Sequence, residues 1–158
     1  MNQVAERAAF DWLARAQTAP EQAHREWTDQ KVALLPLGER FCAIRLPTAL
    51  VHGAFASDDV EAMAAPLTDL LNGPLIRDHF GQYYYSLIEP TPKERWAYNN
   101  VAPLLGAGTY LGVPAASRRE APGIYWVVPP RFADDLCAPK SVAALIAIGR
   151  NLSGEDEQ

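Results

Sequence analysis

Short apolar runs of strand length dominate the middle of the chain. Residues 32–47, VALLPLGERFCAIRLP, contain two such runs around the turn 37–40, where a glycine supplies the positive φ that other residues resist. They predict a central β-hairpin. Runs at 74–77 and 82–88 flank the turn residues 78–81 and predict a second hairpin.

Two further strands are predicted after the hairpins. Residues 104–114, LLGAGTYLGVP, form an apolar run punctuated by glycine, and residues 123–128, GIYWVV, form the last strand before a Pro-Pro pair. Gly106 and Gly108 superficially suggest a phosphate-binding loop. Neither Lys-Ser/Thr nor a helix follows them, however, so the P-loop and the dinucleotide-binding loop are both excluded by context.

Helical periodicity marks the start of the chain and the stretch after the first hairpin. Residues 4–16 and 20–27 predict two N-terminal helices, and the tryptophan of the second is expected to pack on the sheet. Residues 48–55 predict a short helix. Asp59 is the expected N-cap of the next helix, which Pro66 should kink or split.

These elements predict an α+β fold with one domain over residues 1–150. We expect a small central, mostly antiparallel sheet built from hairpins, flanked by the N-terminal helices and by a C-terminal helix at residues 139–149. A chain of 158 residues suits a single domain with a core of its own. The acidic residues 151–158 are expected to form a disordered tail.

Charge and composition narrow the expected partners. The net charge of -5 argues against a broad grip on nucleic-acid phosphates, because that binding gains from clusters of lysine and arginine. No stretch approaches the about 20 apolar residues that cross a bilayer, and the polar start lacks the pattern of a signal peptide. We therefore expect a cytoplasmic protein without a membrane partner. Cys42 and Cys137 form no CxxC motif and are expected to be reduced and buried.

The sequence lacks the common catalytic and metal-binding motifs. None of the three histidines has an H-x₃₋₅-H partner or a nearby cysteine pair, and no G-x-S-x-G motif occurs. Capping or solvation explains the adjacent acids at 58–59 and 134–135. We therefore expect no metal and no cofactor. An enzyme of unrelated chemistry stays open as an alternative, and it would need a pocket that encloses His52 or His79 with an acid.

The order of the segments carries further information. A helical pair with Trp12 and Trp27 precedes LLPLGERFCAIRLP, GPLIRDHFGQYYYSLIEP, LLGAGTYLGVPAAS and GIYWVVPP. This order resembles the Prim-Pol domain of bifunctional DNA primase/polymerases, in the archaeo-eukaryotic primase superfamily, and especially its compact actinobacterial members. The most specific part is G-x-G-x-Y at 106–110 with V-P at 113–114, followed by Y-W at 125–126. It is similar to the glycine-tyrosine-proline strand and the tyrosine-tryptophan strand of that family.

The resemblance implies two-metal nucleotidyl transfer, but the metal-binding acids are missing. The family places an acid-x-acid motif on the second strand of the first hairpin, a histidine motif on a later strand and an acid before the glycine-rich strand. In this sequence the first motif falls on Arg45 and Pro47, the second on Tyr83 or Tyr84, and the third near Pro103. The resemblance therefore implies a catalytically degenerate relative that is not an enzyme.

Two functions follow from this interpretation. The leading hypothesis is a non-catalytic Prim-Pol-like module that acts in regulation or protein–protein interaction, with residues 83–92 as an exposed contact surface. The alternative is residual binding of a nucleotide or single-stranded nucleic acid in the former active-site cleft. There, arginines would bind phosphate while Tyr83 or Tyr84 stacks on a base. The four arginines expected to converge on that cleft are Arg45, Arg77, Arg118 and Arg119.

Overall fold

The computed structural model describes residues 3–152, which form an α+β fold. In chain order the elements are α1 (Gln3–Ala14), α2 (Pro20–Gln30), β1 (Val32–Pro36), β2 (Cys42–Pro47), α3 (Thr48–Phe55), α4 (Val60–Leu71), β3 (Leu75–Asp78), β4 (Tyr83–Ile88), the 3₁₀ turn η1 (Lys93–Arg95), β5 (Leu104–Leu105), β6 (Tyr110–Pro114), β7 (Ile124–Val128) and α5 (Pro139–Leu152). The predicted fold class is confirmed. Within the described range no helix is long and apolar enough to cross a membrane.

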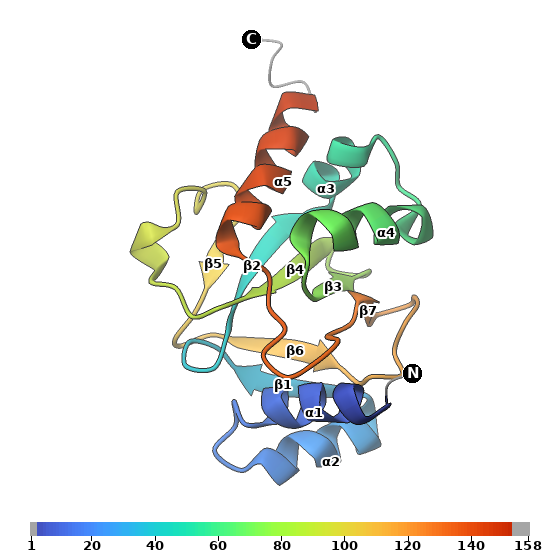
Figure 1. The fold of residues 1–158 in the computed structure, drawn as a ribbon, viewed down its shortest axis with the longest axis vertical. Helices are drawn as coiled ribbons and strands as arrows, with labels where there is room; N and C mark the ends of the chain where they lie inside the picture. Colours follow the sequence, from blue (N-terminus) through green and yellow to red (C-terminus); the bar gives the residue numbers. More distant parts are fainter. Residues whose placement is uncertain (1–2, 153–158) are drawn as a thin grey trace.

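The strands form two antiparallel sheets. Five of them make the main sheet in the order β5-β2-β4-β3-β7, and β1 and β6 make a separate two-stranded sheet, which we call the ribbon. Helices α3, α4 and α5 gather at one end of the molecule, and the ribbon lies near α1 and α2 at the other (Figure 1). One apolar core fills the space between the main sheet and α3, α4 and α5. A second core joins the other face of the main sheet to the ribbon, α1 and α2.

The predicted central hairpin is wrong, although both of its strands exist. Strand β1 pairs with β6, whereas β2 pairs with β4 and β5. The turn between them begins at Gly38, with φ +116°, whose N–H donates to the Phe41 carbonyl at 2.9 Å. Residues of β2 are buried on both faces, Ile44 in one core and Ala43 in the other. A strand that is buried on both faces is typically an interior strand with a neighbour on each side. Strands β4 and β5 occupy the two sides of β2, so β1 pairs with another strand.

The predicted strand 104–114 is also divided between the two sheets. Its first two residues form β5 beside β2, and its last five form β6 in the ribbon. Between them the Thr109 N–H donates to the Gly106 carbonyl at 3.0 Å, and Gly108 has φ +91°, so the chain turns there. The second predicted hairpin is confirmed, because β3 and β4 pair in the register Leu75↔Ser86 to Asp78↔Tyr83.

Most helix boundaries agree with the sequence. Helix α3 spans the predicted residues, and the Asp59 carboxylate caps α4 by accepting from the N–H groups of Glu61 and Ala62 at 3.1 and 3.3 Å. Pro66 does not split α4, which is a single helix on both sides of it. Helix α5 continues to Leu152, beyond the predicted end. The remainder of the predicted tail, residues 153–158, lies outside the described residues.

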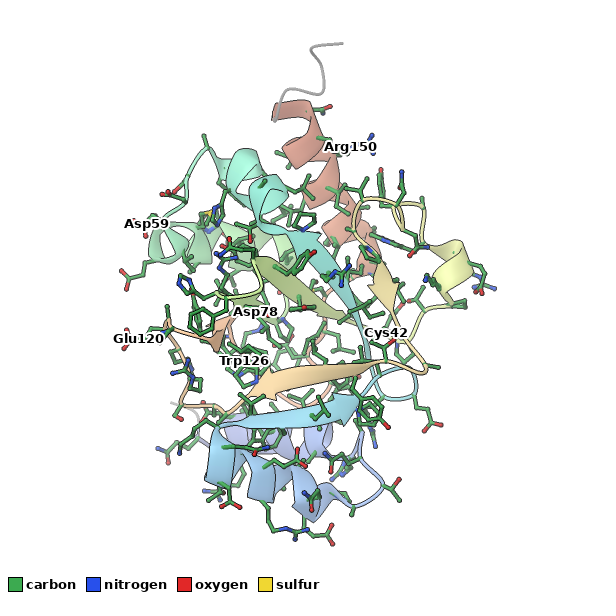
Figure 2. The ribbon with its side chains drawn as sticks, turned by 180° about the vertical axis from the view of Figure 1, so that it is seen from behind. Cys42, Asp59, Asp78, Glu120, Trp126 and Arg150 are labelled. Carbon is green, nitrogen blue, oxygen red and sulfur yellow. The ribbon has the colours of Figure 1, made fainter. Side chains whose placement is uncertain are left out.

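Two tryptophans hold the ribbon between the helices and the main sheet. Trp27 of α2 donates its indole N–H to the Val113 carbonyl, and Trp126 of β7 donates to the Pro114 carbonyl, both at 2.9 Å. Phe10 of α1 packs edge-on against both indoles, with centroids 5.2 and 5.8 Å apart. Trp126 lies beside strand β6 in Figure 2. The predicted packing of Trp27 on the strands is therefore confirmed.

Candidate functional site

Three positions that the resemblance assigns to metal motifs lie together on neighbouring strands. The Arg45 guanidinium of β2 covers the Tyr83 ring of β4, with 4.6 Å between Cζ and the ring centroid. The backbone N–H of Arg45 donates to the carbonyl of Pro103, just before β5, at 3.0 Å. Tyr85 lies beside Tyr83 on the same face, with ring centroids 6.4 Å apart. Arg45, Tyr83 and Tyr85 are half-buried and are called the Arg45 cluster below.

The Arg45 cluster presents cationic and phenolic groups. The Arg45 Nε is buried and has no hydrogen-bond partner. Burial raises the pKa of Tyr85 and the nearby Asp78 carboxylate adds to the rise, whereas the Arg45 charge opposes it. Asp78 itself accepts from the Gly81 N–H at 2.9 Å. These groups suit stacking and phosphate contact rather than cation binding.

Arg77 lies on the opposite face of the main sheet from Arg45. Successive side chains alternate across a strand, and Arg45 pairs with Tyr85 whereas Arg77 pairs with Tyr84. The Arg77 guanidinium is 4.7 Å from the Tyr84 ring centroid. Tyr84 is completely buried, and its hydroxyl lies 2.7 Å from His52 Nε2. A base therefore has no access to the Tyr84 ring.

The other two predicted arginines bind groups of their own chain. Arg118 closes the outer edge of β7, where its carbonyl accepts from the Trp126 N–H at 2.9 Å and its Nε–H donates to the Ile124 carbonyl at 3.3 Å. Arg119 forms an ion pair with Glu6 at 3.1 Å. The four arginines are thus spread over separate parts of the fold. Their predicted convergence on one cleft is wrong, because Arg45 and Arg77 lie on opposite faces of the main sheet and Arg119 pairs with Glu6.

The two cysteines are free and buried, as predicted. Burial raises the pKa of the Cys137 thiol to about 11, so this thiol is a poor nucleophile at neutral pH. Within residues 3–152, no group of three or more His, Cys, Asp or Glu side chains has an arrangement that could hold a metal ion.

An exposed apolar surface was missed by the sequence analysis. Its most exposed members are Phe80 at 75%, Tyr110 at 59% and Leu34 at 55%. The side chains of Val32 and Ile124 both approach Gly112, and the two residues line a groove together with Phe80. These five apolar residues, Val32, Leu34, Phe80, Tyr110 and Ile124, are called the ribbon patch below. The expected surface at 83–92 is present only in part, since residues 84 and 86–88 are buried whereas Glu89, Pro90 and Pro92 are exposed.

The strand edges around the ribbon patch are closed to a further strand. At the outer edge of β1, the Leu34 N–H donates to Glu26 Oε1 and its carbonyl accepts from Gln17 Nε2, both at 2.9 Å. At the edge of β5, the Leu104 N–H donates to Asn99 Oδ1 at 3.0 Å. Edges occupied in this way do not offer a template for strand addition. A partner at this surface therefore has to bind through side chains.

Comparison of the chain with models of protein families, with curated proteins and with solved structures finds no match in any of the three. The resemblance to Prim-Pol domains therefore stays a prediction.

Proposed function

We propose that the chain is a non-catalytic Prim-Pol-like module that acts in regulation by binding another protein through the ribbon patch. The observation that carries this proposal is the exposure of three large apolar side chains, Leu34, Phe80 and Tyr110, that come from three separate parts of the sequence. Monomeric proteins seldom expose large contiguous apolar surface, and such a surface marks an interaction site.

The strand register brings residues of the ribbon patch to one surface. Leu34 of β1 pairs with Gly112 of β6. Because glycine has no side chain, strand β6 places no side chain beside Leu34. A Cβ on Gly112 would lie 3.3 Å from a Val32 methyl carbon and 3.5 Å from the Ile124 Cδ1. Val32 and Ile124 in turn line a shallow groove of about 480 Å³ together with Phe80. Phe80 of the β3–β4 turn and Val32 of the ribbon therefore belong to one surface.

The composition of the patch suits a protein partner. Aromatic residues are enriched in the buried centre of protein interfaces, and Phe80 and Tyr110 supply them here. The groove is also lined by the charged residues Lys31, Asp78 and Arg118, and protein interfaces commonly combine apolar with polar groups in this way.

The proposal that the module is non-catalytic rests on the Arg45 cluster. At the position where the resemblance implies a metal-binding acid, the chain carries a guanidinium that stacks on Tyr83. A fixed positive charge repels a divalent cation, so this face is unsuited to two-metal nucleotidyl transfer. Detection of manganese-dependent polymerisation or ligation of nucleotides by the purified protein contradicts the proposal.

The binding proposal is tested by cross-linking in the native cells followed by affinity purification. The variants Leu34→Asp and Phe80→Asp place a charge in the patch, whereas Phe132→Asp is a matched control at an exposed aromatic residue. The loop between β7 and α5, which contains Phe132, lies in front of the ribbon in Figure 1. In Figure 2, seen from behind, the ribbon lies in front of that loop. We expect a partner that the wild type and the control retain and that both patch variants lose. An identical set of proteins with all four chains contradicts the proposal.

A second function, binding of a nucleotide or single-stranded nucleic acid, is supported by one observation. Arg45 and two tyrosine rings, Tyr83 and Tyr85, lie side by side on one sheet face. Such a group can stack on a base and contact its phosphate. Titration at low salt with labelled nucleoside triphosphates and short single-stranded DNA tests it. Binding should be lost in Arg45→Ala and kept in Arg40→Ala, where the arginine stacks on Trp12 instead.

A further inference from the structure

Arg77 is a buried cation without a counter-charge. Arg77 of β3 pairs with Tyr84 of β4 on one side and with Tyr125 of β7 on the other. Only 5% of the residue is exposed. The guanidinium donates from Nη1 to the Thr48 hydroxyl and covers the Tyr84 ring. Its Nε is buried without a hydrogen-bond partner. Among residues 3–152, no carboxylate forms an ion pair with Arg77.

This burial is costly unless something compensates it. A charge that leaves water loses several kcal/mol of solvation, and proteins usually recover it through an opposite charge and a full set of hydrogen bonds. The chain has 19 acidic residues, yet Arg77 has neutral neighbours. A guanidinium has five N–H donors, and the contact with Thr48 uses only part of them.

The positive end of a helix meets the same guanidinium. Thr48, which accepts from Arg77, is the first residue of α3. The N-cap of α3 is Pro47, and no side chain caps the helix. The first turn of a helix carries free N–H groups and the positive end of the helix dipole. The Thr48 N–H itself donates to the Gln82 carbonyl at 3.3 Å, so the donors left in this turn belong to the residues after Thr48. Two groups that attract anions therefore meet at Thr48.

The remaining walls add groups that can donate hydrogen bonds, and the one carboxylate that acts on them is Asp58 of the α3–α4 loop, which faces His52. The Tyr84 hydroxyl lies 2.7 Å from His52 Nε2, and burial, opposed by the Arg77 charge, raises the pKa of Tyr84 to about 12. Burial and the Arg77 charge lower the pKa of His52. Both side chains are thus neutral at pH 7. Thr48 and His52 are half-buried and Ala49 is exposed, so solvent reaches the start of α3.

We propose that the guanidinium of Arg77 and the first turn of α3 together bind an oxyanion, namely a phosphate group or a carboxylate. Arg77 supplies the charge and planar N–H donors that such oxyanions accept, and the free amides of α3 supply further donors. Tyr84, His52 and Thr48 border the site with groups that can donate or accept. The site lies on the face of the main sheet opposite the Arg45 cluster, and it is independent of the ribbon patch.

The test is denaturant unfolding with inorganic phosphate or acetate at constant ionic strength. An anion that binds only the folded state raises the folding equilibrium constant by about tenfold at ten times its dissociation constant. We expect this rise for the wild type and for Arg40→Met, whose arginine stacks on Trp12 away from both candidate sites. Arg77→Met should lose it. A response to phosphate alone indicates a phosphate group as the ligand, and a response to acetate alone indicates a carboxylate.

A second measurement needs no variant. The imidazole of His52 faces Tyr84, Arg77 and, from the α3–α4 loop, Asp58. An anion on Arg77 offsets the charge that lowers the pKa of His52, so saturating anion should raise that pKa in an NMR titration. Stability and His52 pKa that are both unchanged by phosphate and by acetate would overturn the proposal. A full response in Arg77→Met would overturn it too.

Discussion

The backbone N–H of Leu34 donates to the Glu26 carboxylate at 2.9 Å, so a side chain of α2 occupies the outer edge of β1. The same residue leaves its own side chain 55% exposed in the ribbon patch. The strand edge is thereby closed while the strand face stays open. This combination favours a partner that binds by side-chain contact and disfavours strand addition and aggregation.

Removing the Glu26 carboxylate should open the edge of β1. In Glu26→Ala the Leu34 N–H loses its acceptor, and we expect its amide hydrogen to exchange with solvent faster than in the wild type. Glu21→Ala, on the exposed first turn of the same helix, is the control and should leave that rate unchanged. Equal exchange at Leu34 in all three proteins argues against a protective role of Glu26. The measurement is hydrogen exchange followed by NMR.

Glu26 should also contribute to the acid sensitivity of the fold. Hydrogen bonds from Gln22 and from the Leu34 N–H lower the pKa of Glu26 in the folded state. Its stabilising contribution is therefore complete above the pKa of the unfolded chain, and it is lost as the pH falls through the lowered pKa. Urea unfolding should show that the free energy of unfolding falls less between pH 7 and pH 3 in Glu26→Gln than in the wild type. A parallel loss in both proteins contradicts this assignment.

Tyr84 should make the fold sensitive to alkali. Its folded pKa of about 12 lies above the value near 10 of an unfolded tyrosine, so between these values the unfolded chain releases its proton first. The contribution is complete below about pH 10 and is lost as the pH rises toward 12. The stability difference between wild type and Tyr84→Phe should therefore shrink over this range. A difference that stays constant from pH 10 to pH 12 contradicts this assignment.

The Trp126 indole should stabilise the ribbon by its hydrogen bond as well as by packing. Trp126→Phe leaves the Pro114 carbonyl without the bond that the indole N–H provides at 2.9 Å. We expect a loss of about 1–3 kcal/mol in the free energy of unfolding. Trp12→Phe, at a half-buried tryptophan whose ring packs on Arg40 and Phe41, is the matched control and should cost less. Guanidinium unfolding compares the two.

Helices α3 and α5 should not tolerate a side chain at Gly149. A Cβ there would lie 2.6 Å from the Leu50 carbonyl oxygen, which belongs to backbone and cannot rotate away. We expect Gly149→Ala to lower the free energy of unfolding by about 1–3 kcal/mol, although alanine is the better helix former. Ala147→Ser, on the exposed side of α5, should change it much less. An equal effect of the two substitutions contradicts the close packing of α3 on α5.

Local structure was predictable from the sequence to a greater extent than strand pairing. The Asp59 cap and the β3–β4 hairpin depend on residues a few positions apart, and both were predicted correctly. The partners of β1 and β2 were not, because apolar alternation fixes the face of a strand but leaves its neighbour undetermined. The pairing of Val32 with Pro114 joins residues far apart in the chain, and no short-range pattern encodes it.

The candidate sites show the same division. Arg45 was recognisable as a charge among apolar strand residues, and its contact with Tyr83 follows from the adjacency of β2 and β4. The apolar residues at 32–36 predicted a strand of the central hairpin, and exposure of Leu34 arises because the ribbon has no layer on its outer face. Likewise, the missing counter-charge of Arg77 depends on what α3 places beside it.

The most direct test of the proposed binding function is site-specific photo-cross-linking at Tyr110. A benzophenone amino acid replaces Tyr110, which is 59% exposed in the ribbon patch, or Phe132, which is 49% exposed elsewhere. Each chain is irradiated in the native cells, and adducts are identified by mass spectrometry. The account predicts an adduct with one defined protein at position 110 that is absent at position 132 and abolished by Leu34→Asp. The same adducts at both positions, or no adduct at position 110, would contradict it.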